Sequence, residues 1–203
     1  MKRTLKYPNE MTGFSDEELI QLLKQGELSP LGVLFARYDG MVKSALKRFV
    51  PGLTPEEVED LSQEVFIRVL DLVDSYQEQT RFKAWLYSIA VGKAKNWRRK
   101  HWIRGKLMRR HLQDQQEMNI QGLALLEKLE TRQSALRALS LLSKPQQEVL
   151  WLFAVEGFSG DEISTILSIS SNTVWTRLYR ARQAVLGGLD IQRRNNGQEE
   201  VGS

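Results

Sequence analysis

Cysteine is absent from the 203-residue sequence, which excludes disulfide bonds, thiolate metal ligands and cysteine nucleophiles together. Histidine is scarce: His101 and His111 have no partners at the spacing of a metal site, so we expect no metal and no cofactor. A phosphate-cradling Gly-x-x-x-x-Gly-Lys motif is also missing, and no catalytic constellation indicates an enzyme. No apolar run reaches the roughly 20 residues of a bilayer span. Because no apolar segment follows the basic N-terminus, we expect no signal peptide and a cytoplasmic location.

Acidic residues are missing from the segment Lys93–Arg110, although the whole chain carries 29 basic and 25 acidic side chains. The basic residues of this segment are Lys93, Lys95, Arg98, Arg99, Lys100, Arg104, Lys106, Arg109 and Arg110. Trp97 and Trp102 lie among them, and basic side chains beside aromatic ones suit a surface that holds phosphates and stacks bases. The alternative interpretation is a solvated charged face. Acidic residues gather instead at Glu56–Asp60, where an acidic helix would suit a basic partner.

Segments that alternate with period two are lacking as well, so the sequence predicts no strand. Apolar residues recur near the helical period of 3.6, and the fold class we expect is all-α. In the first half the pattern predicts helices over about 15–25, 31–49, 54–72 and 81–102. The pattern then weakens in a polar stretch that we interpret as a flexible linker joining two small helical domains. The expected parts are an N-terminal tail 1–13, a first domain 14–103, the linker 104–122, a second domain 123–190 and a disordered tail 191–203.

The sharpest local pattern lies in the second domain. Ser143–Gln146 and Ser159–Glu162 both have the form of a capping box, which marks the start of a helix. A short turn at Ser168–Ser170 precedes a further, basic helix. Two helices joined by a tight turn, the second of them longer and basic, are typical of a helix-turn-helix.

The second helix of this motif sorts its residues by face. Its buried face is expected to carry Val174, Leu178, Ala181 and Val185. The outward face, which would read base edges in the major groove, carries Trp175, Thr176, Tyr179 and Arg180. Arg177 and Arg182 flank this face and suit phosphates. The alternative interpretation makes Trp175 and Tyr179 core residues.

Three segments, in this order, resemble one known family. Asp60–Phe66 resembles an Asp-Leu-x-Gln-Glu-x-Phe segment of region 2.2, and Phe82–Ala90 resembles a Phe-x-x-Trp-Leu-x-x-Ile-Ala segment of regions 2.3 and 2.4. The third segment resembles region 4 of the same family, at Pro145–Leu150, Glu162–Ile163 and Thr173–Arg182. From about Phe14 to Leu189 the chain is therefore similar to the extracytoplasmic-function (ECF) group of bacterial sigma factors.

The resemblance implies a non-enzymatic subunit that binds core RNA polymerase and directs promoter-specific initiation of transcription. Its expected partners are the β′ coiled coil and the β subunit of the polymerase, and promoter DNA. Family members are often held inactive by an anti-sigma protein, but the sequence identifies none.

The resemblance also implies roles for individual residues. Core polymerase contacts fall on Asp60, Gln63 and Glu64. Recognition and melting of the −10 element fall on Tyr76, Arg81, Lys93, Asn96, Trp97, Arg98 and Arg99. Contacts with the −35 element fall on Trp175, Thr176, Arg177, Tyr179, Arg180 and Arg182.

Two positions depart from the family pattern. Gly92 lies where the family commonly has asparagine, whose amide can hydrogen-bond a flipped base, and glycine cannot do this. Trp175 lies where many members carry a basic residue, and its indole could instead contact a thymine methyl group.

Two other classes of protein are alternatives to the sigma factor. A stand-alone helix-turn-helix regulator with a sensing N-terminal domain would explain the second domain, but not the region 2 segments of the first. An enzyme that acts on nucleic acid would need a catalytic constellation, which the sequence lacks.

Overall fold

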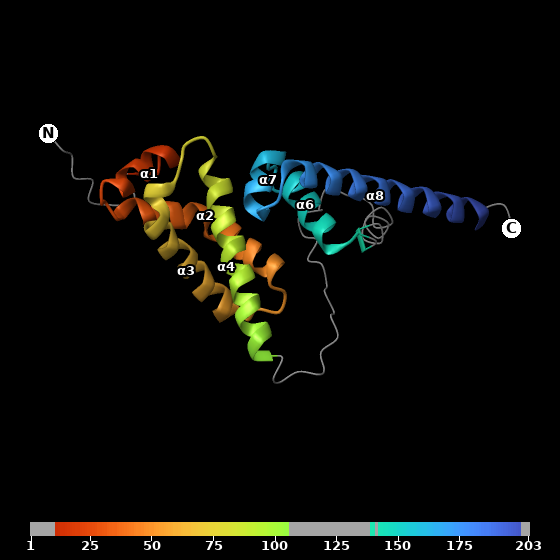
Figure 1. Ribbon diagram of the computed structural model, residues 1–203, viewed down its shortest axis with the longest axis horizontal. Helices are drawn as coiled ribbons and strands as arrows, with labels where there is room; N and C mark the ends of the chain where they lie inside the picture. Colours follow the sequence, from red (N-terminus) through yellow and green to blue (C-terminus); the bar gives the residue numbers. More distant parts are fainter. Residues whose placement is uncertain (1–10, 106–138, 141, 200–203) are drawn as a thin grey trace. The chain divides into compact units, whose positions relative to one another are not determined.

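The computed structural model describes residues 11–105, 139–140 and 142–199, and the side chains of residues 11–101, 139–140 and 142–186. The chain divides into two compact units, Met1–Gln116 and Glu117–Ser203, and each is described by itself. Within these ranges the regular elements are all helices, which confirms the all-α fold class (Figure 1). None of the described helices combines the length and apolarity that crossing a membrane demands.

The described part of the first unit is built from α-helices, labelled in the red-to-green part of Figure 1, and a 3-10 helix that precedes α4. They are α1 (Asp16–Lys24), α2 (Ser29–Phe49), α3 (Pro55–Leu72), the 3-10 helix η2 (Val73–Ser75) and α4 (Phe82–Gly105).

Capping boxes start two of these helices, as the sequence indicates. Before α1, the Ser15 hydroxyl accepts from the Glu18 amide, and the Ser15 amide donates to the Glu18 carboxylate. Thr54 and Glu57 form the same reciprocal pair before α3, with Pro55 in the first turn. Each pair satisfies two amides that the helix leaves without a partner, and such a cap is worth about 1 kcal/mol.

The core of the first unit lies where α2, α3 and α4 pack against one another and α1 covers one end of α2. Its fully buried side chains include Leu19, Leu34, Leu46, Val65, Phe82, Leu86 and Tyr87. Burying each large apolar side chain stabilises the fold by about 1.5–3 kcal/mol. Met11 is fully buried as well, so the packed unit begins inside the segment that the sequence assigns to an N-terminal tail.

A polar cluster fastens α2 to α3 beside this core. The buried Ser62 hydroxyl donates to Asp39 at 2.7 Å, and Lys43 pairs with both Asp39 and Glu59. Hydrogen bonds to these two carboxylates raise the pKa of Lys43. The one fully buried polar residue of the described core therefore has a partner, as buried polar groups require.

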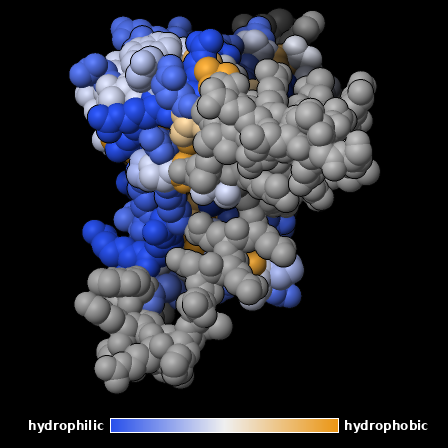
Figure 2. Space-filling view, turned by 90° about the vertical axis from the view of Figure 1, so that its right-hand side faces the viewer, coloured by the Kyte–Doolittle hydropathy of each residue, from blue (hydrophilic) through white to orange (hydrophobic). Residues whose placement is uncertain are grey.

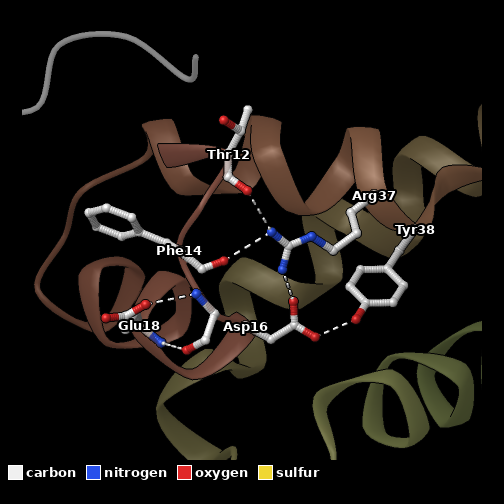
Figure 3. Close-up of polar contacts among 7 residues, drawn as sticks. Thr12, Phe14, Asp16, Glu18, Arg37 and Tyr38 are labelled. Carbon is white, nitrogen blue, oxygen red and sulfur yellow. Dashed lines mark hydrogen bonds and ion pairs between the residues drawn. The ribbon is translucent and has the colours of Figure 1, made fainter. Parts of the chain in front are cut away.

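A second polar cluster fastens α1 to α2, and Figure 3 shows it in close-up. The Asp16 carboxylate accepts from the Arg37 guanidinium and from the Tyr38 hydroxyl. Arg37 also donates to the carbonyl oxygens of Phe14, at 3.0 Å, and of Thr12. Burial, followed by the hydrogen bond to Asp16 and its negative charge, raises the pKa of Tyr38 far above its ordinary value.

The second unit contains α6 (Lys144–Ala154), α7 (Gly160–Leu167) and α8 (Ser171–Glu199). The Ser159–Glu162 capping box starts α7, and Ser168 ends it in the left-handed conformation, with φ +56°. The Ser164 hydroxyl donates to the Ile169 carbonyl and closes the tight turn that leads into α8. Buried side chains that join the three helices are Val149, Leu152, Phe158, Ile163, Ile166, Val174 and Ala181.

The ends of the predicted parts differ from the structure in places. Helix α4 continues to Gly105 and so includes the first residues of the predicted linker 104–122, whose remainder lies outside the described residues. Helix α8 continues to Glu199, whereas the sequence predicts a disordered tail over 191–203. The polar composition suggested disorder, but the segment contains no proline, and Asn195-Asn196-Gly197 lowers helix propensity without breaking the helix.

Candidate nucleic-acid interface

The outward face of α3 brings together the three residues for which the sequence predicts polymerase contacts. Asp60, Gln63 and Glu64 are all exposed, because their spacing of three and four residues places them on one side of the helix. Leu61, Val65 and Val69 of the opposite side are buried. We call the three polar residues, together with Ile67, the α3 surface.

Ile67 was not singled out from the sequence. It lies one turn beyond Gln63 and Glu64, and 60% of it is exposed, which is high for a large aliphatic side chain. An apolar side chain ringed by polar ones is the arrangement found at the centre of protein interfaces. In the sequence Ile67 is indistinguishable from its buried neighbours, so only the helix packing reveals it.

The outward side of α4 carries the basic residues of the predicted −10 site. Asn96, Arg98 and Arg99 are exposed, while Ala90 and Ala94 on the opposite side are buried. The side chains of Arg104, Lys106, Arg109 and Arg110, which belong to the same basic run of sequence, lie outside the described residues. The described part of the run is thus a charged surface of one sign, suited to a phosphate backbone.

Two of the α4 residues are held by neighbours. Lys93 forms an ion pair with Glu64 of α3, 2.6 Å from Nζ to Oε2. The half-buried Trp97 ring stacks on the His101 ring, with 3.7 Å between centroids and 11° between planes. This stack covers one face of the indole and leaves part of its surface accessible.

The loop before α4 differs from its prediction at one residue. Tyr76 is only 3% exposed, because its ring lies among Phe82 and Trp85, at centroid distances of 6.0 and 5.1 Å. Its hydroxyl donates to the Thr80 carbonyl at 2.7 Å and closes the loop on itself. The structure therefore places Tyr76 in the core, beneath the surface that DNA would touch. Burial and the nearby carboxylates raise its pKa. Arg81, in contrast, is exposed.

Helix α8, the second helix of the helix-turn-helix and hereafter the recognition helix, presents the predicted −35 residues to solvent. Trp175 is 53% and Tyr179 is 65% exposed, so the interpretation of these two as core residues is wrong. Thr176, Arg180 and Arg182 are exposed, and Arg177 is half-buried. Of the face predicted to be buried, Val174 and Ala181 are fully buried and Leu178 and Val185 partly so.

The Trp175 indole nevertheless has a defined seat. It lies against Gly160, the first residue of α7: a Cβ added there would be 2.7 Å from Cζ2 of the indole. Trp175 also meets the Phe153 ring edge-on, at 6.2 Å between centroids and 71° between planes. The indole is therefore fixed by its neighbours and still offers an apolar surface beside Thr176.

The described surface carries few large apolar side chains, and those just described are among them. They are Leu28, Ile67, Phe153, Val155, Trp175, Tyr179 and Leu186. Figure 2 shows one face, on which hydrophilic residues predominate among those that are coloured. Within the described ranges, no three or more His, Asp or Glu side chains are grouped so that they could hold a metal ion.

A helix-turn-helix with an exposed basic second helix, in a chain whose other helical unit carries a basic surface of its own, defines a DNA-binding protein of transcription. Residues 34–104 match the family Sigma-70 region 2, and residues 132–185 match Sigma-70, region 4. The chain belongs to the ECF sigma factors of the sigma-70 family. It is thus a non-enzymatic subunit that directs promoter recognition by RNA polymerase.

Its relatives include the ECF RNA polymerase sigma-E factor of Escherichia coli (strain K12), which is 30% identical over 187 residues, covering 84% of this chain and 92% of the relative. The protein of the same name from Haemophilus influenzae is 25% identical over 181 residues, covering 84% and 93%.

Two solved structures share the fold. CnrH in complex with the cytosolic domain of CnrY has a TM-score of 0.56 and 24% identity, covering 87% of this chain and 97% of the other. The sigma factor RpoE in complex with the anti-sigma factor NepR, from Bartonella quintana, has a TM-score of 0.53 and 19% identity, covering 77% and 94%.

Proposed function

We propose that this sigma factor divides its work among three surfaces: the α3 surface binds core RNA polymerase, α4 and its preceding loop recognise and melt the −10 element, and α8 reads the −35 element. The first two belong to a region 2 domain, residues 14–103, and the third to a region 4 domain, residues 123–190. A linker, 104–122, lets both domains reach their promoter elements.

The polymerase-binding role of the α3 surface is supported by its chemistry. Three exposed polar side chains, two of them carboxylates, precede the exposed Ile67 on the same helix face. Carboxylates suit a basic partner surface, here the β′ coiled coil, and the isoleucine supplies apolar area that water would leave on docking. Asp60, Gln63 and Glu64 are the residues whose loss should weaken binding most.

The −10 role is supported by the single sign of charge on α4. To melt a promoter, the protein must hold the DNA phosphates and must offset the free energy lost when bases leave their stack. Lys93, Arg98 and Arg99 would contact phosphates, and Asn96 offers an amide to a base edge. The part of Trp97 that His101 leaves uncovered would lie against an unstacked base. Arg81 would contact the backbone at the loop.

The −35 role is carried by the exposed N-terminal part of α8, which is the part of a recognition helix that enters the major groove. Thr176, Tyr179 and Arg180 would contact base edges, and Arg177 and Arg182 would contact phosphates. Trp175, seated on Gly160, would offer its apolar surface to a thymine methyl group or a deoxyribose.

An anti-sigma protein is a further partner that we propose, since RpoE of Bartonella quintana, which shares the fold, is bound to the anti-sigma factor NepR. Such a protein would block transcription by covering the α3 surface or the recognition helix.

The observation that carries the proposed division is the separate exposure of Asn96 on α4 and Arg180 on α8, each within a basic surface of its own unit. Holoenzyme made from core polymerase and this protein would transcribe a library of DNA with randomised promoters, and the transcribed sequences would be read. Two conserved elements are expected, with Arg180→Ala relaxing only the upstream one and Asn96→Ala only the downstream one. Arg68→Ala, on α3, is the charge control. If Arg180→Ala and Asn96→Ala altered the same element, the division would be wrong.

A further inference from the structure

The short loop between η2 and α4 is fastened to α1 by two side chains for which the sequence and the family resemblance assign no role. The Lys24 ammonium donates to the Tyr76 carbonyl at 3.0 Å and lies 5.8 Å from the centroid of the Tyr76 ring. The Gln21 amide donates to the Glu78 carboxylate at 2.8 Å. Both bonds join residues more than fifty positions apart in the sequence.

These two side chains are not part of the apolar contact that holds α1 in place. Leu19, Ile20 and Leu23 are buried and form that contact, whereas Gln21 is exposed and Lys24 half-buried. The Asp16 cluster fastens the beginning of α1 to α2 independently. Removing the hydrogen bonds of Gln21 and Lys24 should therefore leave α1 in place and release the loop.

The loop is anchored at its first residue by the buried Tyr76 ring, which packs against Phe82 and Trp85. Its own bonds run from the Tyr76 hydroxyl to the Thr80 carbonyl, at 2.7 Å, and from the Thr80 amide to the Gln77 carbonyl, at 3.2 Å. These bonds close the loop on itself, whereas the bonds of Gln21 and Lys24 tie it to α1. Gln77, Glu78 and Gln79 are exposed at its tip. Their amide and carboxylate groups are of the kind that hydrogen-bond the Watson–Crick edge of a base.

We infer that Gln21 and Lys24 are positioning residues for the −10 element: by holding Tyr76 and Glu78 they fix the loop so that its tip discriminates between bases. This inference rests on the proposed −10 role of the loop and deepens it. A recognition group must be held within about half an ångström of its productive place, and neighbouring hydrogen bonds supply that restraint. With the restraint removed the loop would still contact DNA, but it would adapt to several bases.

The test uses the full chain in holoenzyme, with a library of DNA duplexes premelted over a randomised −10 element as the probe. Lys24→Met keeps the aliphatic stem of the side chain and loses the donor, whereas Lys24→Arg restores a cationic donor. Gln25→Ala, at the exposed end of the same helix, is the matched control. Bound sequences and the affinity for core polymerase are measured for each protein.

We expect the double variant Lys24→Met/Gln21→Ala to lower the ratio of affinities for the best and the worst base by roughly tenfold. This factor corresponds to the free energy of one hydrogen bond to a charged group. Lys24→Arg and Gln25→Ala are expected to keep the wild-type preference, and all variants to bind core polymerase equally. An unchanged preference in the double variant would overturn the inference. If the wild-type protein itself showed no base preference, the proposed −10 role would fail first.

Hydrogen exchange in the free protein provides a measurement that does not depend on DNA. The amides of residues 76–81 are expected to exchange several-fold faster in the double variant, while those of α2 and α3 stay unchanged. Equal exchange at residues 76–81 would show that the loop does not need α1 and would overturn the inference. Faster exchange throughout the unit would indicate a general loss of stability and would overturn it also.

Discussion

Glu64 of α3 and Lys93 of α4 form an ion pair across the surface of the first unit, with 2.6 Å between Oε2 and Nζ. The side chains are 54% and 31% exposed, so water screens the pair, and such pairs stabilise a fold by at most about 1 kcal/mol. Glu64 belongs to the proposed polymerase surface and Lys93 to the proposed −10 surface. A polymerase group that engages Glu64 would therefore leave the Lys93 ammonium available for a DNA phosphate.

This relationship predicts that Glu64→Gln makes the free protein bind nonspecific single-stranded DNA more tightly. The neutral amide no longer competes with phosphate for Lys93, so affinity should rise roughly twofold to fivefold at low salt, the range of a surface ion pair. The gain should disappear at high salt because the attraction is screened. Fluorescence anisotropy with a labelled oligonucleotide at several salt concentrations measures it. Asp71→Asn is the matched control, since it releases Arg68, outside the proposed −10 surface.

The contact between Gly160 and Trp175 predicts a second, non-additive effect. A methyl group at residue 160 would lie 2.7 Å from the indole, so Gly160→Ala should turn Trp175 out of its seat. We expect the affinity for −35 duplex DNA to fall on the order of tenfold, a loss like that of one good base contact. The free energy of unfolding should change by less than about 1 kcal/mol, because the exposed indole can move.

The double-mutant cycle separates this account from a general disturbance of the motif. In a Trp175→Ala background, Gly160→Ala should have no further effect on −35 affinity, because nothing remains for the methyl group to displace. Additive losses from the two substitutions would contradict the proposed seat.

The cluster around Asp16 predicts a dependence of stability on pH (Figure 3). The pKa of Tyr38 in the folded protein is raised above its ordinary value of 10.0. Above pH 10 the unfolded chain therefore loses this proton while the folded chain keeps it, so the contribution of Tyr38 to stability falls as pH rises. Tyr38→Phe should cost about 1 kcal/mol at pH 7, the worth of one hydrogen bond.

Denaturation by urea between pH 7 and pH 11 measures this difference. The stability gap between wild-type protein and Tyr38→Phe should be constant up to about pH 10 and then shrink. Titrating lysines affect both proteins alike and cancel in the comparison. A gap that stayed constant to pH 11 would show that Tyr38 does not titrate as inferred.

Much of the fold could be predicted from the sequence because its signals are local. Capping boxes such as Ser15–Glu18 and Ser159–Glu162 lie within four residues, and the apolar period of each helix shows which side is buried. The exposed face of α8 follows from the same period. The bounds and the buried sides of capped, regular helices can therefore be predicted without knowing the tertiary structure.

The features that could not be predicted depend on contacts between distant residues. Tyr76 lies in a polar stretch of sequence, and only its packing against Phe82 and Trp85 shows that it is buried. The bond from Lys24 to the Tyr76 carbonyl is invisible in the sequence for the same reason. The Trp175 indole packs where residue 160 has no Cβ. A single glycine in a sequence does not reveal such a contact, because glycine occurs for many structural reasons. The sequence thus predicts the type and position of the candidate site residues, but not the contacts that hold them in place.

Binding of the purified protein to bacterial core RNA polymerase tests the central claim most directly, with Asp60→Ala/Glu64→Ala as the variant and Glu17→Ala/Asp74→Ala as the charge-matched control. We predict tight binding by the wild-type protein and by the control, and binding on the order of tenfold weaker or worse for the variant, since interface charges are costly to remove. Equal binding by all three proteins would remove the α3 surface from the polymerase interface. Absence of binding by the wild-type protein would contradict the account as a whole.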